Sequence, residues 1–135
     1  MMQYLLDTSV FSQPLRRKAN ECALLRWKAV GDSRCRVCMV TLAEVEFGLS
    51  LEESPMRREK YRAILENRLE VLPTDERTWL TFARMKARQL KIGQRIADLD
   101  LLIAANAQVH QLTVATLNST DFSRIEGIAW EDWGA

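Results

Sequence analysis

Residues 99–110 read Leu-Asp-Leu-Leu-Ile-Ala-Ala-Asn-Ala-Gln-Val-His, a stretch of helical length with apolar side chains around nearly its whole circumference. A helix of this kind is buried on all sides, as happens between a sheet and its neighbouring helices. The stretch therefore predicts a layered α/β fold.

Short β-rich runs and longer helical patterns alternate along the rest of the chain. The predicted strands span residues 3–6, 35–40, 112–115 and 127–130, each near a polar break. The other predicted helices span residues 20–30, 56–69 and 75–93, the last beginning at Asp75 as N-cap. Strands separated by helices pair in parallel through right-handed crossovers, and ligands gather at the carboxyl ends of such strands.

Two of these helices carry apolar side chains on one side. The stripe of the 56–69 helix consists of Tyr61, Ile64, Leu65 and Leu69. The side of the 75–93 helix consists of Trp79, Phe82, Ala83 and Leu90. The aromatic residues Trp27, Phe47, Tyr61 and Trp79 are more bulk than a thin α/β domain needs, and core packing explains them about as well as a protein interface does.

The composition limits the classes of function. The chain has 135 residues, one domain's length, and 47% hydrophobic content, enough for a core. Nineteen Lys and Arg balance eighteen Asp and Glu, so any electrostatic function is local. Without a leader or a membrane-spanning apolar run, we expect one domain over residues 1–135 in a soluble, cytoplasmic protein that makes no contact with a membrane.

The three cysteines favour a reducing compartment over a disulfide framework, because their number is odd. Cys35 and Cys38 lie three apart in an apolar run. An extended chain sends such residues to opposite faces, which predicts buried packing rather than joint metal ligation.

Four acidic residues follow the predicted elements at positions where packing does not require a charge. Asp7 ends the first strand, Glu44 lies just after the second, Asp100 opens the buried helix and Asp121 follows a late strand. In a parallel sheet these segments converge at one edge. Carboxylates at such short separations cannot all stay ionised unless a cation is present. The four acids therefore predict a site for Mg²⁺ or Mn²⁺.

Each acid also has a purely structural interpretation. Thr41-x-x-Glu44 fits a capping box, and the pattern leaves capping and metal binding equally open. Asp98 and Asp100 point to different sides of a helix, so we predict Asp98 as the N-cap and Asp100 as the site residue. Asp121 fits a cap of the short turn 121–124, and Asp7 fits the start of a turn.

Taken together, five motifs resemble the PIN-domain family, in particular the toxin nucleases called VapC. They are Leu6-Asp7-Thr8-Ser9, Thr41-x-x-Glu44-x-x-x-Gly48, Asp100-x-x-Ile103-Ala104-Ala105, Thr116-x-Asn118-x-x-Asp121-Phe122 and Glu131-Asp132-Trp133. Each motif is short and unspecific. Their order and separations carry the resemblance, which spans almost the whole chain.

The resemblance implies a single three-layer α/β/α domain with a central, mostly parallel sheet of four or five strands. It implies four metal ligands: Asp7, Glu44, Asp100 and Asp121. It also implies four supporting residues, of which Thr8 and Asn118 support the acids, Ser9 lies beside the first acid and Thr116 orients the fourth. Leu117 departs from the family, where many members carry a polar or basic residue, which puts a substrate contact there in doubt. Asp98 is not counted among these four ligands and is kept as a candidate for holding a second ion.

The implied activity is that of a Mg²⁺- or Mn²⁺-dependent endoribonuclease, the toxin of a type II toxin–antitoxin pair. Metal-activated water would hydrolyse RNA phosphodiesters and leave 5′-phosphate and 3′-hydroxyl ends. The implied partners are RNA, a second copy of the chain and a small antitoxin that covers the site.

Basic residues must surround an acidic pocket that repels phosphate. The candidates are Arg16, Arg17, Lys18, Arg84, Lys86, Arg88, Lys91 and Arg95. A second group is interpreted as solvated surface: Arg57, Arg58, Lys60 and Arg62.

Two rival functions are weighed against the nuclease. A Mg²⁺-dependent phosphoryl-transfer domain also places acids at strand ends, but a phosphatase of that type needs Asp-x-Asp where Asp7-Thr8-Ser9 stands, and a receiver needs a Lys where Glu131 stands. A PIN-like domain that only binds a partner remains the other alternative. The presence of all four acids argues against it.

Overall fold

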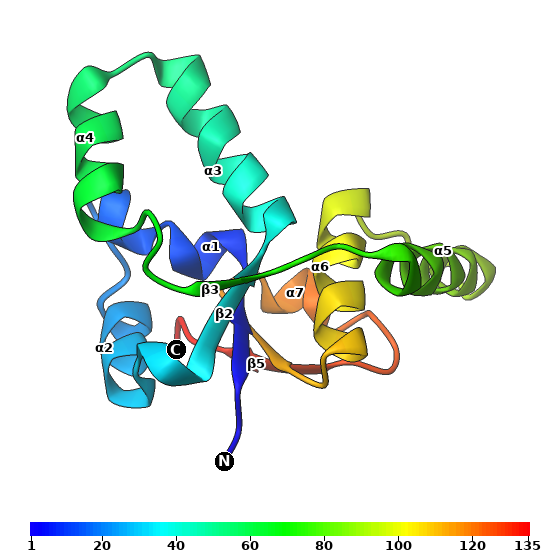
Figure 1. The fold of residues 1–135 in the computed structure, drawn as a ribbon. Helices are drawn as coiled ribbons and strands as arrows, with labels where there is room; N and C mark the ends of the chain where they lie inside the picture. The colour runs from blue at the N-terminus through cyan, green and yellow to red at the C-terminus, as the bar shows by residue number, and fades with distance from the viewer.

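The computed structural model describes residues 1–135 and contains one five-stranded sheet in which every pairing is parallel. The strand order is β3-β2-β1-β4-β5 (Figure 1). The strands are β1 (Tyr4–Leu6), β2 (Cys35–Cys38), β3 (Glu70–Leu72), β4 (Thr113–Thr116) and β5 (Ala129–Asp132). The predicted α/β/α class with a mostly parallel sheet is confirmed.

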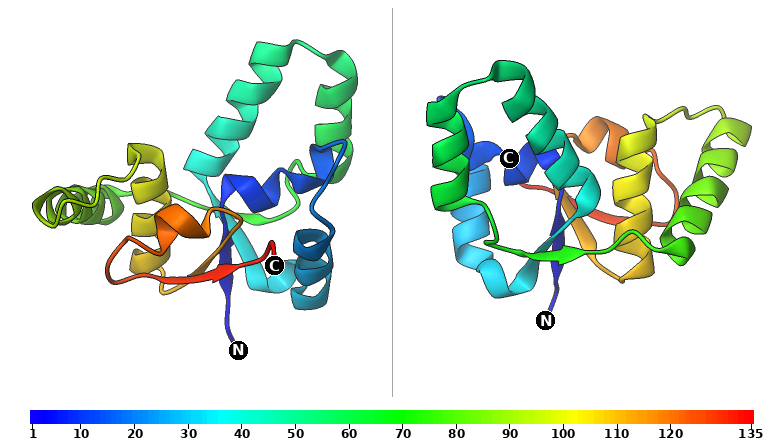
Figure 2. Two further views of the ribbon diagram at one scale, coloured as in Figure 1. Left: turned by 180° about the vertical axis from the view of Figure 1, so that it is seen from behind. Right: turned by 45° about the horizontal axis from the view of Figure 1, so that its top comes forward.

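Helices cover both faces of this sheet (Figures 1 and 2). On one side lie α1 (Thr8–Phe11) and α2 (Glu21–Val30), and on the other α5 (Glu76–Lys91), α6 (Asp98–Val109) and α7 (Ser119–Phe122). The pair α3 (Met39–Glu52) and α4 (Pro55–Ile64) extends past the carboxyl end of β2. Two short 3₁₀ helices, η1 (Gln13–Leu15) and η2 (Asp32–Arg34), lie in the connections. No helix combines the length and the apolar character that crossing a membrane requires.

The core has two halves, one on each face of the sheet. Every residue of α6 from Leu101 to Ala107 is buried, as the sequence predicts. Central strand β1 contributes Leu5 to one half, and Tyr4 and Leu6 to the other. Since the carboxyl end of β1 lies between the two layers, the residue that follows it is enclosed from both sides.

Cys35 and Cys38 lie in opposite halves of the core, so the prediction of buried packing is confirmed. Burial raises the pKa of the Cys35 thiol to about 11, with a smaller contribution from the negative charge of Asp32. Cys22 is exposed.

Native protein is therefore expected to present one reactive thiol. At pH 8 a thiol reagent should label Cys22 rapidly and Cys35 and Cys38 only on unfolding, because a buried thiol rarely forms the thiolate nucleophile. Counting labelled thiols by mass spectrometry before and after denaturation measures this. Rapid labelling of all three in the folded protein would contradict the arrangement of the sheet.

The structure corrects several predicted boundaries. The strand predicted at 35–40 ends at Cys38, and the helix predicted at 56–69 ends at Ile64. The left-handed backbone of Asn67 turns the chain there, so Leu65 and Leu69 reach the core from a loop. The sequence pattern does not indicate strand β3. The strands predicted to begin at residues 112 and 127 begin one and two residues later in the structure, at Thr113 and Ala129.

The apolar side of α5 is also different from the prediction. Trp79 and Leu90 are about half exposed, whereas Thr78, Met85 and Gln89 form the buried side. Gln89 is accommodated because its side chain donates to the carbonyls of Gln94 and Arg124. Its amide oxygen also accepts from the backbone N–H of Glu126.

Candidate active site

Asp7 is the most enclosed of the four acids, at 3% exposure. It follows β1 directly and is the N-cap of α1. One carboxylate oxygen accepts hydrogen bonds from Ser9 Oγ (2.6 Å) and the Val10 N–H (3.1 Å), and the other accepts from Thr116 Oγ1 (2.5 Å). Asp7 thus has the structural role that its sequence position allows, because it caps the first turn after β1. The cap uses only one carboxylate oxygen, so it does not exclude a second role.

Burial raises the pKa of Asp7, and the hydrogen bonds from Ser9 and Thr116 offset only part of that effect. A carboxyl group that must ionise in such a place gains from a nearby cation. The ionised form of Asp7 is therefore disfavoured by burial more than its hydrogen bonds favour it.

Glu44 lies in the second turn of α3 and is partly buried. The capping-box interpretation is wrong, because the N-cap of α3 is Cys38 and Thr41 lies inside the first turn, fully buried. The Glu44 carboxylate instead accepts a hydrogen bond from Thr8 Oγ1, the first side chain of α1. The contact joins α3 to the end of β1, which places Glu44 beside Asp7.

Asp100 lies in the first turn of α6 and is partly buried. Its pKa is raised to about 6, first by burial and then by the negative charges of Asp121, Asp7 and Glu44. All three other predicted acids therefore act on Asp100. The structure brings the four together at the carboxyl edge of the sheet, as the parallel topology predicts.

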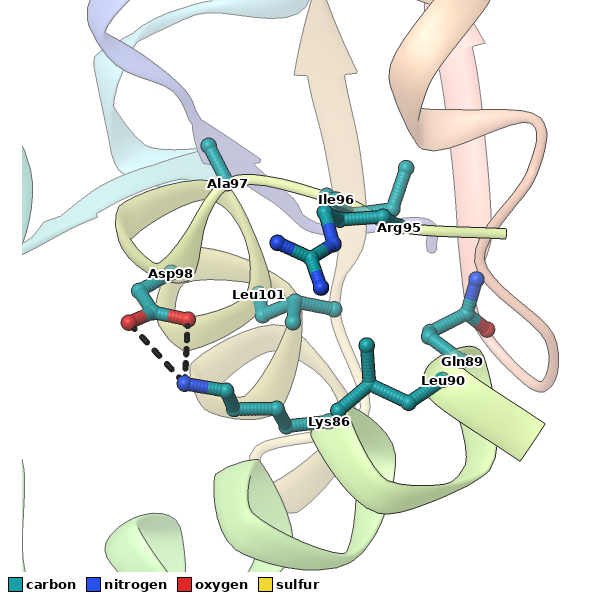
Figure 3. Close-up of a pocket in the computed structure, with 8 residues that line it drawn as sticks. All are labelled: Lys86, Gln89, Leu90, Arg95, Ile96, Ala97, Asp98 and Leu101. Carbon is teal, nitrogen blue, oxygen red and sulfur yellow. Dashed lines mark hydrogen bonds and ion pairs between the residues drawn. The ribbon is translucent and has the colours of Figure 1, made fainter. Parts of the chain in front are cut away.

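Asp98 is not the N-cap of α6, contrary to the prediction. Ala97 occupies that position without a side-chain cap. The Asp98 carboxylate is exposed and pairs with Lys86 Nζ at 3.0 Å (Figure 3). The pair borders a hollow of about 400 Å³ between α5 and the start of α6, and Asp98 is not among the charges that act on Asp100. The choice of Asp100 over Asp98 thus agrees with the geometry.

Asp121 lies inside α7, so the alternative that it caps this turn is wrong. Its carboxylate accepts hydrogen bonds from Asn118 Nδ2 (2.9 Å) and from the Arg124 guanidinium (2.6 Å). These donors lower the pKa of Asp121. Arg124 was missed from the sequence, where only its position one helical turn after Asp121 indicates a contact.

Hydroxyl and amide groups connect the end of β1 to the end of β4. Thr116 Oγ1 donates to Asp7 and accepts from the Asn118 N–H (2.7 Å), while Ser9 Oγ donates to Asp7 and accepts from the Leu117 N–H (2.9 Å). The predicted role of Thr116 is corrected, since it holds the first acid and Asn118 holds the fourth. The Leu117 side chain packs against the core, consistent with the doubt about a substrate contact there.

The donor set fits a hard divalent cation. Four carboxylates converge, one of them with a strongly raised pKa, and Mg²⁺ and Mn²⁺ prefer such oxygen ligands. No three of these carboxylates are close enough together in the structure to coordinate one ion jointly. Asp7, Glu44 and Asp121 each direct one oxygen to a hydrogen-bond donor of the protein.

Five of the twelve basic residues singled out from the sequence form ion pairs within the chain. Arg57, Arg58 and Arg62 pair with Glu52, Glu46 and Glu59, as expected for solvated surface. Among the substrate candidates, Lys86 pairs with Asp98 and Arg88 with Glu126.

The chain is similar to known proteins over nearly its whole length. The family model described as "PIN domain" matches residues 4–128. The protein named toxin FitB, from Neisseria gonorrhoeae, is 30% identical and aligns over 96% of this chain and 97% of its own. The tRNA(fMet)-specific endonuclease VapC of Salmonella typhimurium is 29% identical over 98% of this chain and 99% of its own. The crystal structure of FitAcB from Neisseria gonorrhoeae superimposes with a TM-score of 0.88 at 28% identity, covering 97% and 98% of the two chains.

Proposed function

The chain belongs to the PIN-domain family, and we propose that it is an endoribonuclease that uses Mg²⁺ or Mn²⁺ to hydrolyse RNA phosphodiesters. One observation carries the proposal: the carboxylates of Asp7, Glu44, Asp100 and Asp121 gather at the carboxyl edge of the sheet, where burial and then the charges of the other three raise the pKa of Asp100. Burying mutually repelling carboxylates destabilises a fold, unless a ligand of opposite charge offsets the cost. The relatives named ribonucleases and toxins supply the reaction class.

The four acids would hold the cation, and the polar residues around them would fix their positions. A bound divalent ion supplies a water of lowered pKa and neutralises charge on the phosphate. Thr116 and Ser9 hold the Asp7 carboxylate from both sides, and Thr8 and Asn118 hold Glu44 and Asp121. Because these side chains need little further ordering, most of the entropy cost of assembling the site is met in folding.

Hydrolysis breaks the bond between phosphorus and the 3′-oxygen. The water oxygen joins the phosphorus, one proton passes to the leaving oxygen, and the products carry 5′-phosphate and 3′-hydroxyl ends. No side chain forms a covalent intermediate in this scheme.

The similarity to the proteins named toxin FitB and VapC leads us to propose that the chain is the toxin of a type II toxin–antitoxin pair. A homodimer and a small antitoxin would be its partners. Exposed apolar side chains fit such interfaces, among them Phe47 and Leu51 of α3 and Trp79 of α5, which are 68%, 74% and 51% exposed.

Cleavage of total cellular RNA tests the activity. Purified protein is expected to produce discrete fragments with Mn²⁺ and none with EDTA, and restored Mn²⁺ should restore cleavage. Transfer RNA is the first fraction to examine, given the substrate in the name of the Salmonella relative. Fragments that persist in EDTA would contradict the metal-dependent mechanism.

A further inference from the structure

A hollow of about 280 Å³ lies next to the acids, between η1, α3 and the start of α4. Thr8 and Glu44 form part of its wall, so it opens directly from the proposed site. The wall also includes Ser12, Arg16, Glu52 and Arg57. An RNA strand whose scissile phosphate meets the acids would reach this hollow with a neighbouring nucleotide.

Arg16 is the one basic side chain in this hollow whose charge is not already neutralised. Arg57 Nε lies 3.0 Å from Glu52 Oε2, so these two groups cancel. Arg16 is exposed and has no carboxylate within ion-pair distance, in contrast to nine other Lys and Arg side chains of the chain. Arg84 and Arg95 are also without ion pairs and border hollows, but no proposed metal ligand borders those.

The backbone that carries Arg16 is firmly anchored. Gln13, at 4% exposure, donates to the Ser9 carbonyl (2.7 Å) and accepts from the Asn20 N–H (2.8 Å). The Arg16 N–H in turn donates to the Gln13 carbonyl at 3.0 Å, and Leu15 is buried in the core. Since Ser9 also holds Asp7, the segment that presents Arg16 is tied to the acids themselves.

Ser12 adds a second donor to the wall. Its hydroxyl oxygen is shielded from solvent and has no hydrogen-bond partner in the chain. A buried hydroxyl without a partner costs free energy, which a phosphate oxygen could recover.

We propose that Arg16, assisted by Ser12, binds a backbone phosphate of the RNA strand next to the scissile phosphodiester. This inference rests on the proposed function. A guanidinium binds a phosphate through two parallel hydrogen bonds, and a free one beside the acids offsets their repulsion of the substrate. The contact reads the backbone and is independent of sequence.

An RNA-binding measurement tests this inference. The ligand is a fluorescein-labelled pool of random single-stranded 20-nucleotide RNAs, and binding is followed by fluorescence anisotropy in Mn²⁺. The protein carries Asp100→Asn, so that the RNA is not cleaved during the measurement. Adding Arg16→Ala should raise the apparent Kd about tenfold at low salt. It should also reduce the slope of log Kd against log salt by about 0.7, the value for one phosphate of a single strand. Arg16→Lys should fall between the two, because it keeps the charge and loses the fork.

Arg77→Ala is the matched control, since Arg77 is exposed, forms no ion pair and borders none of the larger hollows. In the otherwise wild-type chain, Arg16→Ala should raise KM for RNA cleavage and change kcat little. An Arg16→Ala protein that binds and cleaves like Arg77→Ala overturns this inference and leaves the nuclease standing. A wild-type chain that neither cleaves total RNA nor binds the RNA pool overturns both.

Discussion

Asp7→Asn is expected to lower the rate of RNA cleavage by about a thousandfold or more while the protein stays folded. The substitution removes one negative charge from the proposed cation site, and several kcal/mol of transition-state stabilisation go with a bound metal. Asparagine preserves the shape: its amide oxygen can accept from Ser9 and Val10, and Thr116 Oγ1 can accept from its amide nitrogen. Since burial raises the pKa of Asp7, replacing the ionised group removes an unfavourable charge.

The measurement combines single-turnover cleavage with thermal unfolding in EDTA. The Asp7→Asn protein should unfold at or above the wild-type midpoint, so lost activity cannot be assigned to lost structure. Asp132→Asn is a suitable control, because Asp132 is exposed at the end of β5. Wild-type turnover in Asp7→Asn would remove Asp7 from the site.

Asp100→Asn is expected to have two opposite effects, a loss of cleavage of similar size and a gain in stability without metal. The pKa of Asp100 is about 6 in the folded protein, against 3.8 for an unperturbed aspartate. A raised carboxyl pKa means that ionisation disfavours the fold, so the cost is absent below about pH 4 and complete above about pH 6. After allowance for partial exposure, Asp100→Asn should add about 2 kcal/mol to the free energy of unfolding at pH 7.5.

Denaturant unfolding in EDTA at pH 4.5 and pH 7.5 measures this gain, which should shrink at the lower pH. Mn²⁺ should then raise the unfolding midpoint of the wild type by more than that of Asp100→Asn, because a ligand that binds the folded protein more tightly stabilises it more. Asp98→Asn, two residues away on the same helix, should keep wild-type cleavage within about twofold, since it loses only an exposed ion pair. An equal stabilisation at both pH values would contradict the raised pKa of Asp100.

The positions of the acids were predictable because they follow from topology. A residue directly after a buried strand reaches the carboxyl edge of a parallel sheet whatever the details of packing. Asp7 and Asp100 needed only the apolar runs beside them to be placed. For Glu44 the sequence left two roles open, metal binding and helix capping, because Thr41 and Glu44 match a capping box. Since α3 begins at Met39, before Thr41, that capping pattern does not apply.

Other features depend on contacts between distant parts of the chain. Strand β3 is three residues long with Glu70 and Val71 exposed, and it forms a strand because β2 lies beside it. The run Cys35 to Val40 is apolar except for Arg36, and residues 37–40 show no alternation, so periodicity cannot show where the strand ends and the helix begins. Gln89 is buried because loops more than thirty residues away use its amide, which no local pattern indicates.

The central position of β1 bears on when activity can arise during synthesis. Asp7 and Thr116, whose side chains meet in the site, are 109 residues apart. At about 5–20 residues per second, the ribosome needs about 5–20 seconds to pass from one to the other. A nascent or truncated chain without β4 and α7 carries Asp7, Glu44 and Asp100 but lacks Asp121 and the Thr116 hydroxyl that holds Asp7. The proposed site can therefore assemble only after α7 has been synthesised, so the proposed cleavage activity is expected to arise late in synthesis.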